Sequence, residues 1–230
     1  MTKIISFVSQ AGDQGKSLLA QALAAYCTEN GLKTSVVCLD RENRSTYDWG
    51  IEREEMGIDL RINVIKADSV SDAFDKISNE DIYILDTPSR ASVAIFDVFA
   101  KSDLVVMPTI PYEKGLNLTL SVVHSILSNL EKEKGSDFAI DSMKKILICI
   151  NRLPVSSKTS EGNLVLDAMN YLSGYSFNNK QLNICKQVVP ERIGYNNAIK
   201  QRLTILETAH PSLNNIVNNV MESILEATYV

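Results

Sequence analysis

Gly15, Lys16 and Ser17 follow one another near the N-terminus, and these three residue types in this order suit the binding of a phosphate. The backbone N–H groups that begin a helix attract anions, and a glycine lets a phosphate approach that backbone closely. The lysine would neutralise the charge of β- and γ-phosphates, and the serine hydroxyl is a Mg²⁺ ligand. The stretch predicts a nucleotide phosphate loop that consists of Gly12, Asp13, Gln14, Gly15, Lys16, Ser17 and Leu18.

Two aspartates could complete this site with a metal ion. Asp40 follows an apolar run at residues 35–39, and Asp86 ends another at residues 82–86. Open α/β sheets bind ligands at the carboxyl ends of parallel strands, where both side chains would meet the phosphate loop. We therefore expect a magnesium-nucleotide site in which Ser17 and Asp86 hold the metal. The alternative is that both aspartates have a structural role. Asp40 would then cap a helix or turn, and Asp86 would be a strand-end carboxylate that accepts hydrogen bonds from nearby N–H groups.

The loop also has an alternative interpretation. Gln10 occupies the first-glycine position of G-x-x-x-x-G-K-[ST], and such a triplet also arises by chance at a helix start, with its lysine in solvent. However, the triplet comes directly after an apolar run at residues 4–9 and opens an amphipathic segment. This is the context that a phosphate loop requires, so it favours the phosphate site.

Short apolar runs alternate with helical patterns along the chain, and this alternation would position the site. Strands are predicted at residues 4–9, 35–39, 62–67, 82–86, 104–108 and 145–150, with a weaker one at 184–189. Most are β-branched and nearly continuous, as in parallel strands buried on both faces. Helices are predicted over residues 17–29, 113–132 and 211–227, and loops around a short helix over 151–180. The pattern predicts an α/β fold, with a mainly parallel sheet covered by helices on both faces, in one domain over residues 1–230.

The composition is that of an ordinary globular protein, with 45% hydrophobic residues, 22% charged residues and a net charge of −5. This charge argues against a surface that is coated with nucleic acid. The four cysteines lack C-x-x-C spacing and are expected to be reduced core thiols, which favours the cytoplasm. No apolar run reaches membrane-spanning length. His124 and His210 lack metal-spaced companions, and Trp49 is expected to pack in the interior.

The stretch SQAGDQGKSLLA resembles the N-terminus of the ParA/MinD family of P-loop ATPases, which partition plasmids and chromosomes or position cellular machinery. The loop of that family reads K-G-G-x-G-K-[ST], so Gly12, Gly15, Lys16 and Ser17 match it. Ala11 replaces the family's signature lysine. The resemblance implies the P-loop NTPase fold, with ATP and Mg²⁺ as ligands.

Five later segments follow the family in the same order and extend the resemblance over nearly the whole chain: VVCLDREN, DIYILDTPS, SDLVVMPTIP, ILICINRLP and VVPERIGYNNA. The resemblance implies that Asp40 helps to orient the attacking water, although Cys38 stands where the family has another aspartate. It also implies that Asp86 holds magnesium through water and that residues 87–89 move with the γ-phosphate. The base would be contacted by Asn151, Arg152 and a late loop that contains Pro190.

Two substitutions separate the loop from the family pattern. The family's lysine reaches the partner's nucleotide in an ATP-bound dimer, so Ala11 leaves either another cation or a weaker dimer. Asp13 replaces a glycine and adds a carboxylate near the phosphates, a repulsion of roughly 4 kcal/mol at about 4 Å and an effective dielectric constant of about 20. Magnesium and Lys16 would offset much of it. Acidic residues at this position also occur in dethiobiotin synthetase, which binds ATP without the signature lysine.

Residues 176–205 contain five basic residues and one acidic residue, a local charge of +4 in a chain of −5. A solvated helix face is the ordinary explanation. The alternative is a patch that binds DNA phosphates without sequence preference, formed by Lys186, Arg192, Lys200 and Arg202. ParA-like proteins carry such contacts in this third of the chain. The segment 211–227 has an apolar stripe but no Lys or Arg, so it is expected to pack on the sheet or a partner subunit and not on a membrane.

The resemblance therefore implies a cytoplasmic ATP hydrolase with Lys16 and Asp40 as catalytic residues. It would form a homodimer with ATP bound, associate with DNA and a centromere-binding or other adaptor protein, and act in plasmid or chromosome partition. One alternative is a nucleotide-sensing adaptor with little turnover, for example in conjugative transfer or positioning. Another is a ligase of the dethiobiotin synthetase type, which the segments VVCLDREN and DTPS disfavour.

Overall fold

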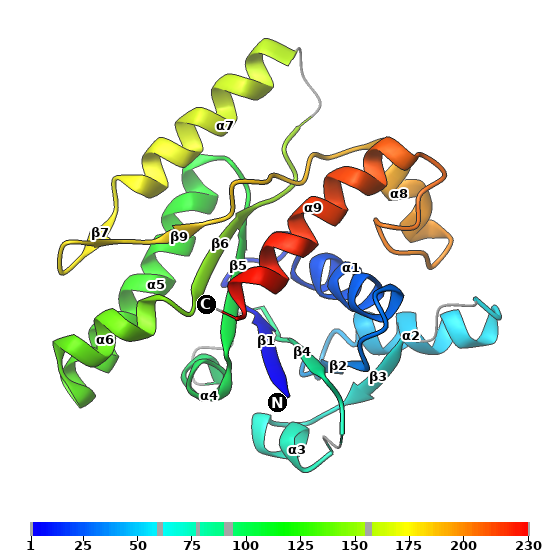
Figure 1. Ribbon diagram of the computed structural model, residues 1–230, viewed down its shortest axis with the longest axis horizontal. Coiled ribbons are helices and arrows are strands. Elements are labelled where there is room, and N and C mark those ends of the chain that lie inside the picture. Colours follow the sequence, from blue (N-terminus) through cyan, green and yellow to red (C-terminus); the bar gives the residue numbers. More distant parts are fainter. Residues whose placement is uncertain (1, 59–61, 77–78, 90–93, 155–157, 230) are drawn as a thin grey trace.

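The computed structural model describes residues 2–58, 62–76, 79–89, 94–154 and 158–229, and Figure 1 shows how they are arranged. Within these residues, seven parallel strands form one sheet in the order β3, β2, β4, β1, β5, β6, β9. Their bounds are β1 Lys3–Phe7, β2 Thr34–Cys38, β3 Asn63–Lys66, β4 Ile82–Asp86, β5 Leu104–Thr109, β6 Ile146–Ile150 and β9 Asn183–Ile184. A separate antiparallel pair consists of β7 Ser176–Phe177 and β8 Lys180–Gln181.

Helices connect the strands and cover the sheet. Their bounds are α1 Lys16–Glu29, α2 Ser45–Glu55, α3 Val70–Asp75, α4 Ala94–Lys101, α5 Glu113–Lys134, α6 Ser136–Met143, α7 Lys158–Ser173, α8 Ile193–Lys200 and α9 Pro211–Ala227. Strand, helix and strand alternate as predicted, and the predicted α/β fold with a parallel sheet is confirmed.

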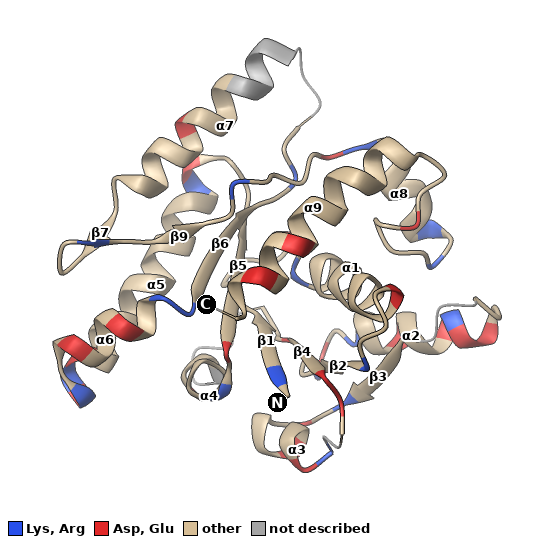
Figure 2. Cartoon of the chain, viewed as in Figure 1, with Lys and Arg blue, Asp and Glu red and all other residues tan. Residues whose placement is uncertain are grey.

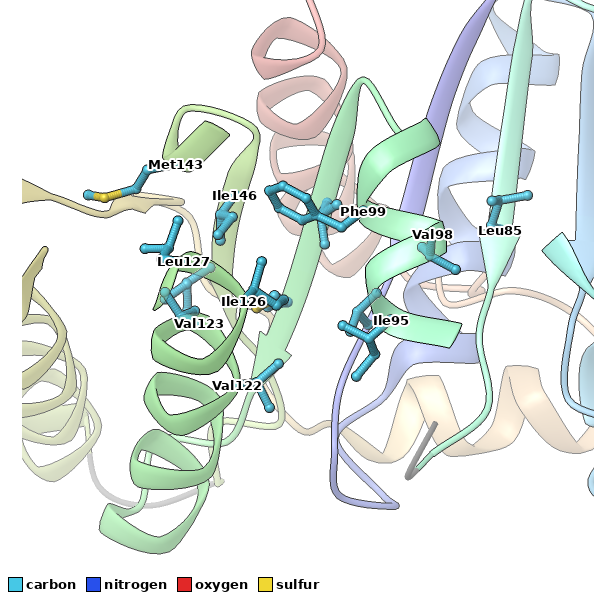
Figure 3. Packing of buried hydrophobic residues seen from close by; sticks show 14 of the residues in the cluster. Leu85, Ile95, Val98, Phe99, Val122, Val123, Ile126, Leu127, Met143 and Ile146 are labelled. Carbon is cyan, nitrogen blue, oxygen red and sulfur yellow. The ribbon is translucent and has the colours of Figure 1, made fainter. Parts of the chain in front are cut away.

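Alternate side chains of the strands enter two separate cores. On β4, Ile82 and Ile84 pack with α1 and α9, whereas Tyr83 and Leu85 pack on the opposite face with helices that include α4 and α5. Figure 3 shows the second core, where Val98 of α4 and other labelled side chains lie between the helices and the sheet. Charged residues gather on helices and loops and are few on the central strands (Figure 2). A sheet that is buried on both faces explains the continuous apolar runs of the sequence.

Three strand ends meet at one point of the carboxyl edge of the sheet. In the register of the parallel ladders, Phe7 of β1 and Cys38 of β2 both pair with Asp86 of β4. The loop after β1, the segment after β2 and the last residue of β4 are therefore adjacent. This register places the phosphate loop, Asp40 and Asp86 together, as the sequence predicts.

Two predictions about the C-terminal half are wrong. The predicted strand at 184–189 is a strand only at Asn183–Ile184, because the following residues bond to β6 at separate points, such as the N–H of Val189 to the carbonyl of Ile150 at 3.1 Å. The predicted short helix within 151–180 is the 16-residue helix α7. Ala168 and Leu172 of α7 are buried in the core, but polar residues around them conceal this apolar stripe in the sequence.

The C-terminal helix and the cysteines behave as expected. Val217, Val220 and Ile224 of α9 are buried and share a core cluster with α1 and the sheet. All four cysteines are free and buried. Trp49 is 5% exposed, so it is a packing residue. Among the described residues, no helix has both the length and the apolar character that crossing a bilayer requires.

Candidate nucleotide-binding site

The loop between β1 and α1 depends on a glycine at its last position. Gly15 caps α1 with a φ of 86°, in the left-handed region where side chains are disfavoured. A Cβ atom at this position would lie 2.0 Å from Nδ2 of Asn151, which is too close for any side chain. Asp13 also adopts a positive φ of 62°, which aspartate tolerates better than most residues. Among the described residues, no side chain caps the start of α1, so its first backbone N–H groups are available to a ligand.

Lys16 is a buried cation that joins this loop to the segment after β4. Its side-chain Nζ donates to Oγ of Ser9 at 3.1 Å and to Oγ of Ser89 at 2.7 Å, and the residue is only 7% exposed. Burial lowers the pKa of Lys16 from its ordinary value, while the nearby carboxylates of Asp86, Asp40 and Asp13 act in the opposite direction. Neutral hydroxyls compensate a buried ammonium poorly, so an anion is its natural partner.

Asp86 is a buried carboxylate with one unused oxygen. Its Oδ2 accepts a hydrogen bond of 2.6 Å from Oγ1 of Thr46, and its Oδ1 has no hydrogen-bond partner among the described residues. Burial raises the pKa of Asp86, and the hydroxyls of Thr46 and Ser17 and the charge of Lys16 partly oppose this rise. Buried polar atoms are almost always paired in proteins. The free oxygen therefore suits a bound cation, and Ser17 lies close enough to share it.

Asp40 has the turn-capping contacts of its structural alternative. Its Oδ1 accepts hydrogen bonds from the backbone N–H groups of Glu42 at 3.2 Å and Asn43 at 2.8 Å. Asp40 also lines the cavity described next, so its carboxylate serves the turn and faces the site at once. The structure supports the turn interpretation and leaves one carboxylate oxygen for other contacts.

A cavity of about 410 Å³ lies over the loop and brings together most of the predicted site. Its walls include the predicted residues Gly12, Asp13, Gly15, Lys16, Ser17, Leu18, Asp40, Asn151, Arg152 and Pro190. Gln14, which is 3% exposed, and Asp86, which is 2% exposed, lie beneath these walls. A second cavity of about 720 Å³ adjoins the first and shares Gly12, Asp40, Asn43, Thr87 and Ser89 with it.

Comparison with known proteins gives no match to a family model and no match to a curated protein sequence. Solved structures do match. A protein from Borrelia burgdorferi B31 assigned to plasmid partition, bound to AMPPNP, aligns at 16% identity and a TM-score of 0.70, over 98% of this chain and 99% of that one. The MinD cell division protein of Aquifex aeolicus aligns at 13% identity and a TM-score of 0.69, over 98% and 97%. Cobyrinic acid a,c-diamide synthase from Mycobacterium smegmatis, with an ATP analogue and magnesium, aligns at 13% and 0.64, over 98% and 95%.

The fold is that of the ParA/MinD ATPases. At these identities the likeness concerns the fold and does not extend to the chemistry of the site. The expected resemblance is thus confirmed at the level of architecture, over nearly the whole length of the chain.

The ParA/MinD resemblance implies base contacts for Asn151 and Arg152, but their hydrogen bonds serve the phosphate loop. Nδ2 of Asn151 donates to the carbonyl of Gln14 at 2.9 Å, and Nη1 of Arg152 donates to the carbonyl of Asp13 at 2.8 Å. Nη2 of Arg152 also lies 3.3 Å from a carboxylate oxygen of Glu191. We call Asn151 and Arg152 the loop clamp, since they hold two successive carbonyls of the loop and support the left-handed backbone at Asp13.

The predicted DNA-binding residues have different surroundings. Arg192 lines the cavity of about 410 Å³, and Arg202 forms an ion pair with Glu52 of α2. Lys186 and Lys200 are exposed. Of the four residues, only Lys186 and Lys200 therefore have the exposed position that a patch for DNA phosphates requires.

Sequence reasoning missed Thr46 and did not foresee the contacts of two further polar residues of the site, Ser89 and Tyr195. Ser89 holds Lys16, Thr46 holds Asp86, and Tyr195 of α8 lines the cavity. Ser45 and Thr46 are the first two residues of α2, and hydroxyl side chains at a helix start are only a weak local signal. The partners of Thr46 and Ser89 lie 40 and 73 positions away in the sequence, so no local motif contains them.

Proposed function

We propose that the protein binds ATP with magnesium in the 410 Å³ cavity and hydrolyses it, as a ParA-like ATPase. One observation carries the proposal. A buried ammonium, Lys16, and a buried carboxylate oxygen of Asp86 lie at the bare N-terminus of α1. Burial of either charge is costly even though the two charges partly compensate each other, and a phosphate chain with a divalent cation would satisfy both.

The chain's own residues would grip the phosphates at several points. The backbone N–H groups after Gly15 would donate to phosphate oxygens, and Lys16 would exchange the hydroxyl of Ser89 for a phosphate anion. That exchange would release residues 87–89, of which Thr87 and Ser89 line both cavities. The loop clamp would keep the carbonyls of the loop turned away from the phosphates.

Magnesium fits the donor set. Mg²⁺ prefers oxygen ligands and is usually held by one or two carboxylates together with substrate phosphates. The hydroxyl of Ser17 and the free oxygen of Asp86 are the residues that would hold it. Bound there, the ion would neutralise charge that develops on the phosphate oxygens. Asp40 would orient the attacking water through the carboxylate oxygen that its turn does not use.

For the cellular role, we propose plasmid or chromosome partition in the cytoplasm. Two copies of the chain would pair with ATP bound, and the pair would associate with DNA and with a centromere-binding or other adaptor protein. The shared fold supports this proposal, since proteins assigned to plasmid partition and cell division have it.

A nucleotide-sensing adaptor with little turnover is the second candidate. The turn bonds at Asp40 occupy one oxygen of the residue that should orient water. Ala11 also leaves the loop without the lysine that reaches a partner's nucleotide in the family. Both features weaken hydrolysis without weakening the grip on the phosphates.

Titration of the purified protein with fluorescent ATP, with magnesium or with EDTA, tests the shared part of both candidates. Phosphate release is then followed with and without DNA. Binding accompanied by measurable release supports the ATPase, and binding without release under any condition supports the adaptor. Absence of binding with magnesium present would overturn both.

A further inference from the structure

Helix α2 begins at the metal-binding position that we propose. Thr46, its second residue, is fully buried, and its hydroxyl donates to Oδ2 of Asp86 at 2.6 Å. The same hydroxyl oxygen accepts a hydrogen bond from Nε2 of Gln21 at 3.1 Å. A hydroxyl has one proton. Because the Thr46 oxygen accepts from Gln21, its proton is donated to Asp86. The orientation of the carboxylate, and so the direction of its free Oδ1, depends on Thr46.

The rest of α2 is fastened to a different part of the molecule. The indole Nε1 of Trp49 and Nη1 of Arg53 both donate to the carbonyl of Arg202, each at 2.9 Å. Arg53 is 3% exposed and forms an ion pair of 2.8 Å with Glu207. Residues 202–207, which we call the rear segment, directly follow α8.

Helix α8 forms the far wall of the nucleotide cavity. Tyr195, Asn196 and Ile199 of α8 line it, and the chain continues from α8 into the rear segment. Helix α2 therefore contacts both Asp86, near the phosphate loop, and the rear segment, which continues from α8. The hydrogen bond to Asp86 is buried and those to Arg202 are partly buried, so they are stronger than hydrogen bonds exposed to water.

We propose that Thr46 is the positioning residue for Asp86 and that α2 couples cation binding at this carboxylate to the rear segment behind α8. The inference rests on the proposed function, because the cation is the one that accompanies the nucleotide. Thr46 touches neither the nucleotide nor the metal. It acts through Asp86, in the way that outer hydrogen-bond partners orient metal ligands in other proteins.

The protein contains its own reporter for this coupling. Trp49 is the only tryptophan of the chain, lies three residues after Thr46 and donates to the rear segment. In the experiment, the protein is saturated with AMPPNP in EDTA and MgCl₂ is then titrated in, while tryptophan emission is recorded. A fluorescent ADP in a parallel titration gives the affinity with and without Mg²⁺.

Thr46→Val removes the hydroxyl and keeps the branched shape. We expect nucleotide affinity in EDTA to stay within about twofold of wild type, and the Mg²⁺ concentration at half-effect to rise by roughly 10- to 100-fold, as for other outer partners of metal ligands. The Mg²⁺-induced change in Trp49 emission should be lost at Mg²⁺ concentrations that saturate wild type. Thr46→Ser restores the hydroxyl and should restore both responses.

Two further variants keep the test decisive. Thr28→Val makes the same chemical change on α1, where the hydroxyl donates to the carbonyl of Ala24 in the same helix, and it should behave like wild type. Gln21→Met removes the donor to Thr46 and should give an intermediate response, even if Thr46→Val does not fold. Normal Mg²⁺ responses in folded Thr46→Val, or in Gln21→Met if the former is unfolded, would overturn the inference alone. Failure of wild type to bind any nucleotide would overturn the proposed function and this inference with it.

Discussion

The two ends of the nucleotide cavity are built in different ways. The phosphate end is formed by seven consecutive residues, 12–18. It contains two buried charges, Lys16 within this loop and Asp86 at the end of β4. The base end is assembled from strand exit 151–152 and residues 189–199, and its charged side chains, Arg152, Glu191 and Arg192, are partly exposed. Buried charges interact strongly with a ligand and exposed ones weakly. The comparison therefore indicates that the phosphates supply most of the affinity and that the base end orients the ligand.

Lys16→Ala should have the largest effect, because it removes the buried cation of the phosphate end. Losing a charge-assisted hydrogen bond costs on the order of 3 kcal/mol, so nucleotide affinity should fall by roughly 100-fold. Fluorescent ATP titration measures the loss. Lys132→Ala changes an exposed lysine of α5 outside the cavity and should leave affinity unchanged. Equal affinity in both variants would remove the phosphate end as the source of binding.

Arg152→Ala tests whether the loop clamp belongs to the phosphate end or to the base end. Without the hydrogen bond to the carbonyl of Asp13, the loop should loosen and lose roughly tenfold in affinity, about 1.4 kcal/mol. The clamp predicts the same factor for ATP and for tripolyphosphate, which has no base. Competition titrations against fluorescent ADP measure both. A loss confined to ATP would instead support the base contact that the family resemblance implies.

The phosphate end can be predicted from the sequence more fully than the base end. Phosphate recognition uses backbone and neighbouring side chains, so Gly15, Lys16 and Ser17 are legible as a local motif, and the strand pattern places Asp86 beside them. The loop clamp joins residues that are 137 and 139 positions apart. Whether such side chains face a base or a carbonyl depends on the packing of two loops. No periodicity or spacing in the chain encodes that choice.

The sequence predicts only a short helix among loops where the 16-residue helix α7 lies. Its buried stripe is narrow, and polar residues occupy the remaining positions, so composition suggested a loop. The central strands gave no such difficulty, since burial on both faces leaves them almost wholly apolar. Sequence patterns therefore predict the middle of this sheet better than its edge near β9.

Asp86→Asn should stabilise the protein without ligand while it weakens the Mg²⁺ site at the phosphate end. Burial raises the pKa of Asp86 above its ordinary value of 3.8, so its stabilising contribution is complete below that pH and is lost as pH rises through the folded-state pKa. Asparagine never ionises. Each kcal/mol of this penalty that the variant removes at pH 7 should raise its melting temperature by about 2–4 °C.

Thermal melts at pH 7 and pH 4, without nucleotide, check this expectation. The gain should shrink at pH 4, because more of wild-type Asp86 is protonated there than at pH 7. In the presence of ADP, Mg²⁺ should raise the melting temperature of wild type and not that of the variant. A variant that melts lower than wild type at pH 7, with normal secondary structure, would show that the carboxylate is compensated within the protein and has no need of a cation.

The smallest effect is expected farthest from the phosphates, at the exposed lysines of the predicted DNA patch. Each lysine that contacts a DNA phosphate contributes about one unit to the slope of log affinity against log salt, so Lys186→Ala with Lys200→Ala should reduce that slope by about two. Fluorescence anisotropy of labelled duplex DNA, measured at several salt concentrations with ATP and Mg²⁺, gives the slope.

Arg192→Ala is the informative comparison, since this residue lines the proposed nucleotide cavity and should alter ATP affinity more than the salt slope. An unchanged slope in the double variant would assign these lysines to a solvated face, and DNA binding would then need a different surface.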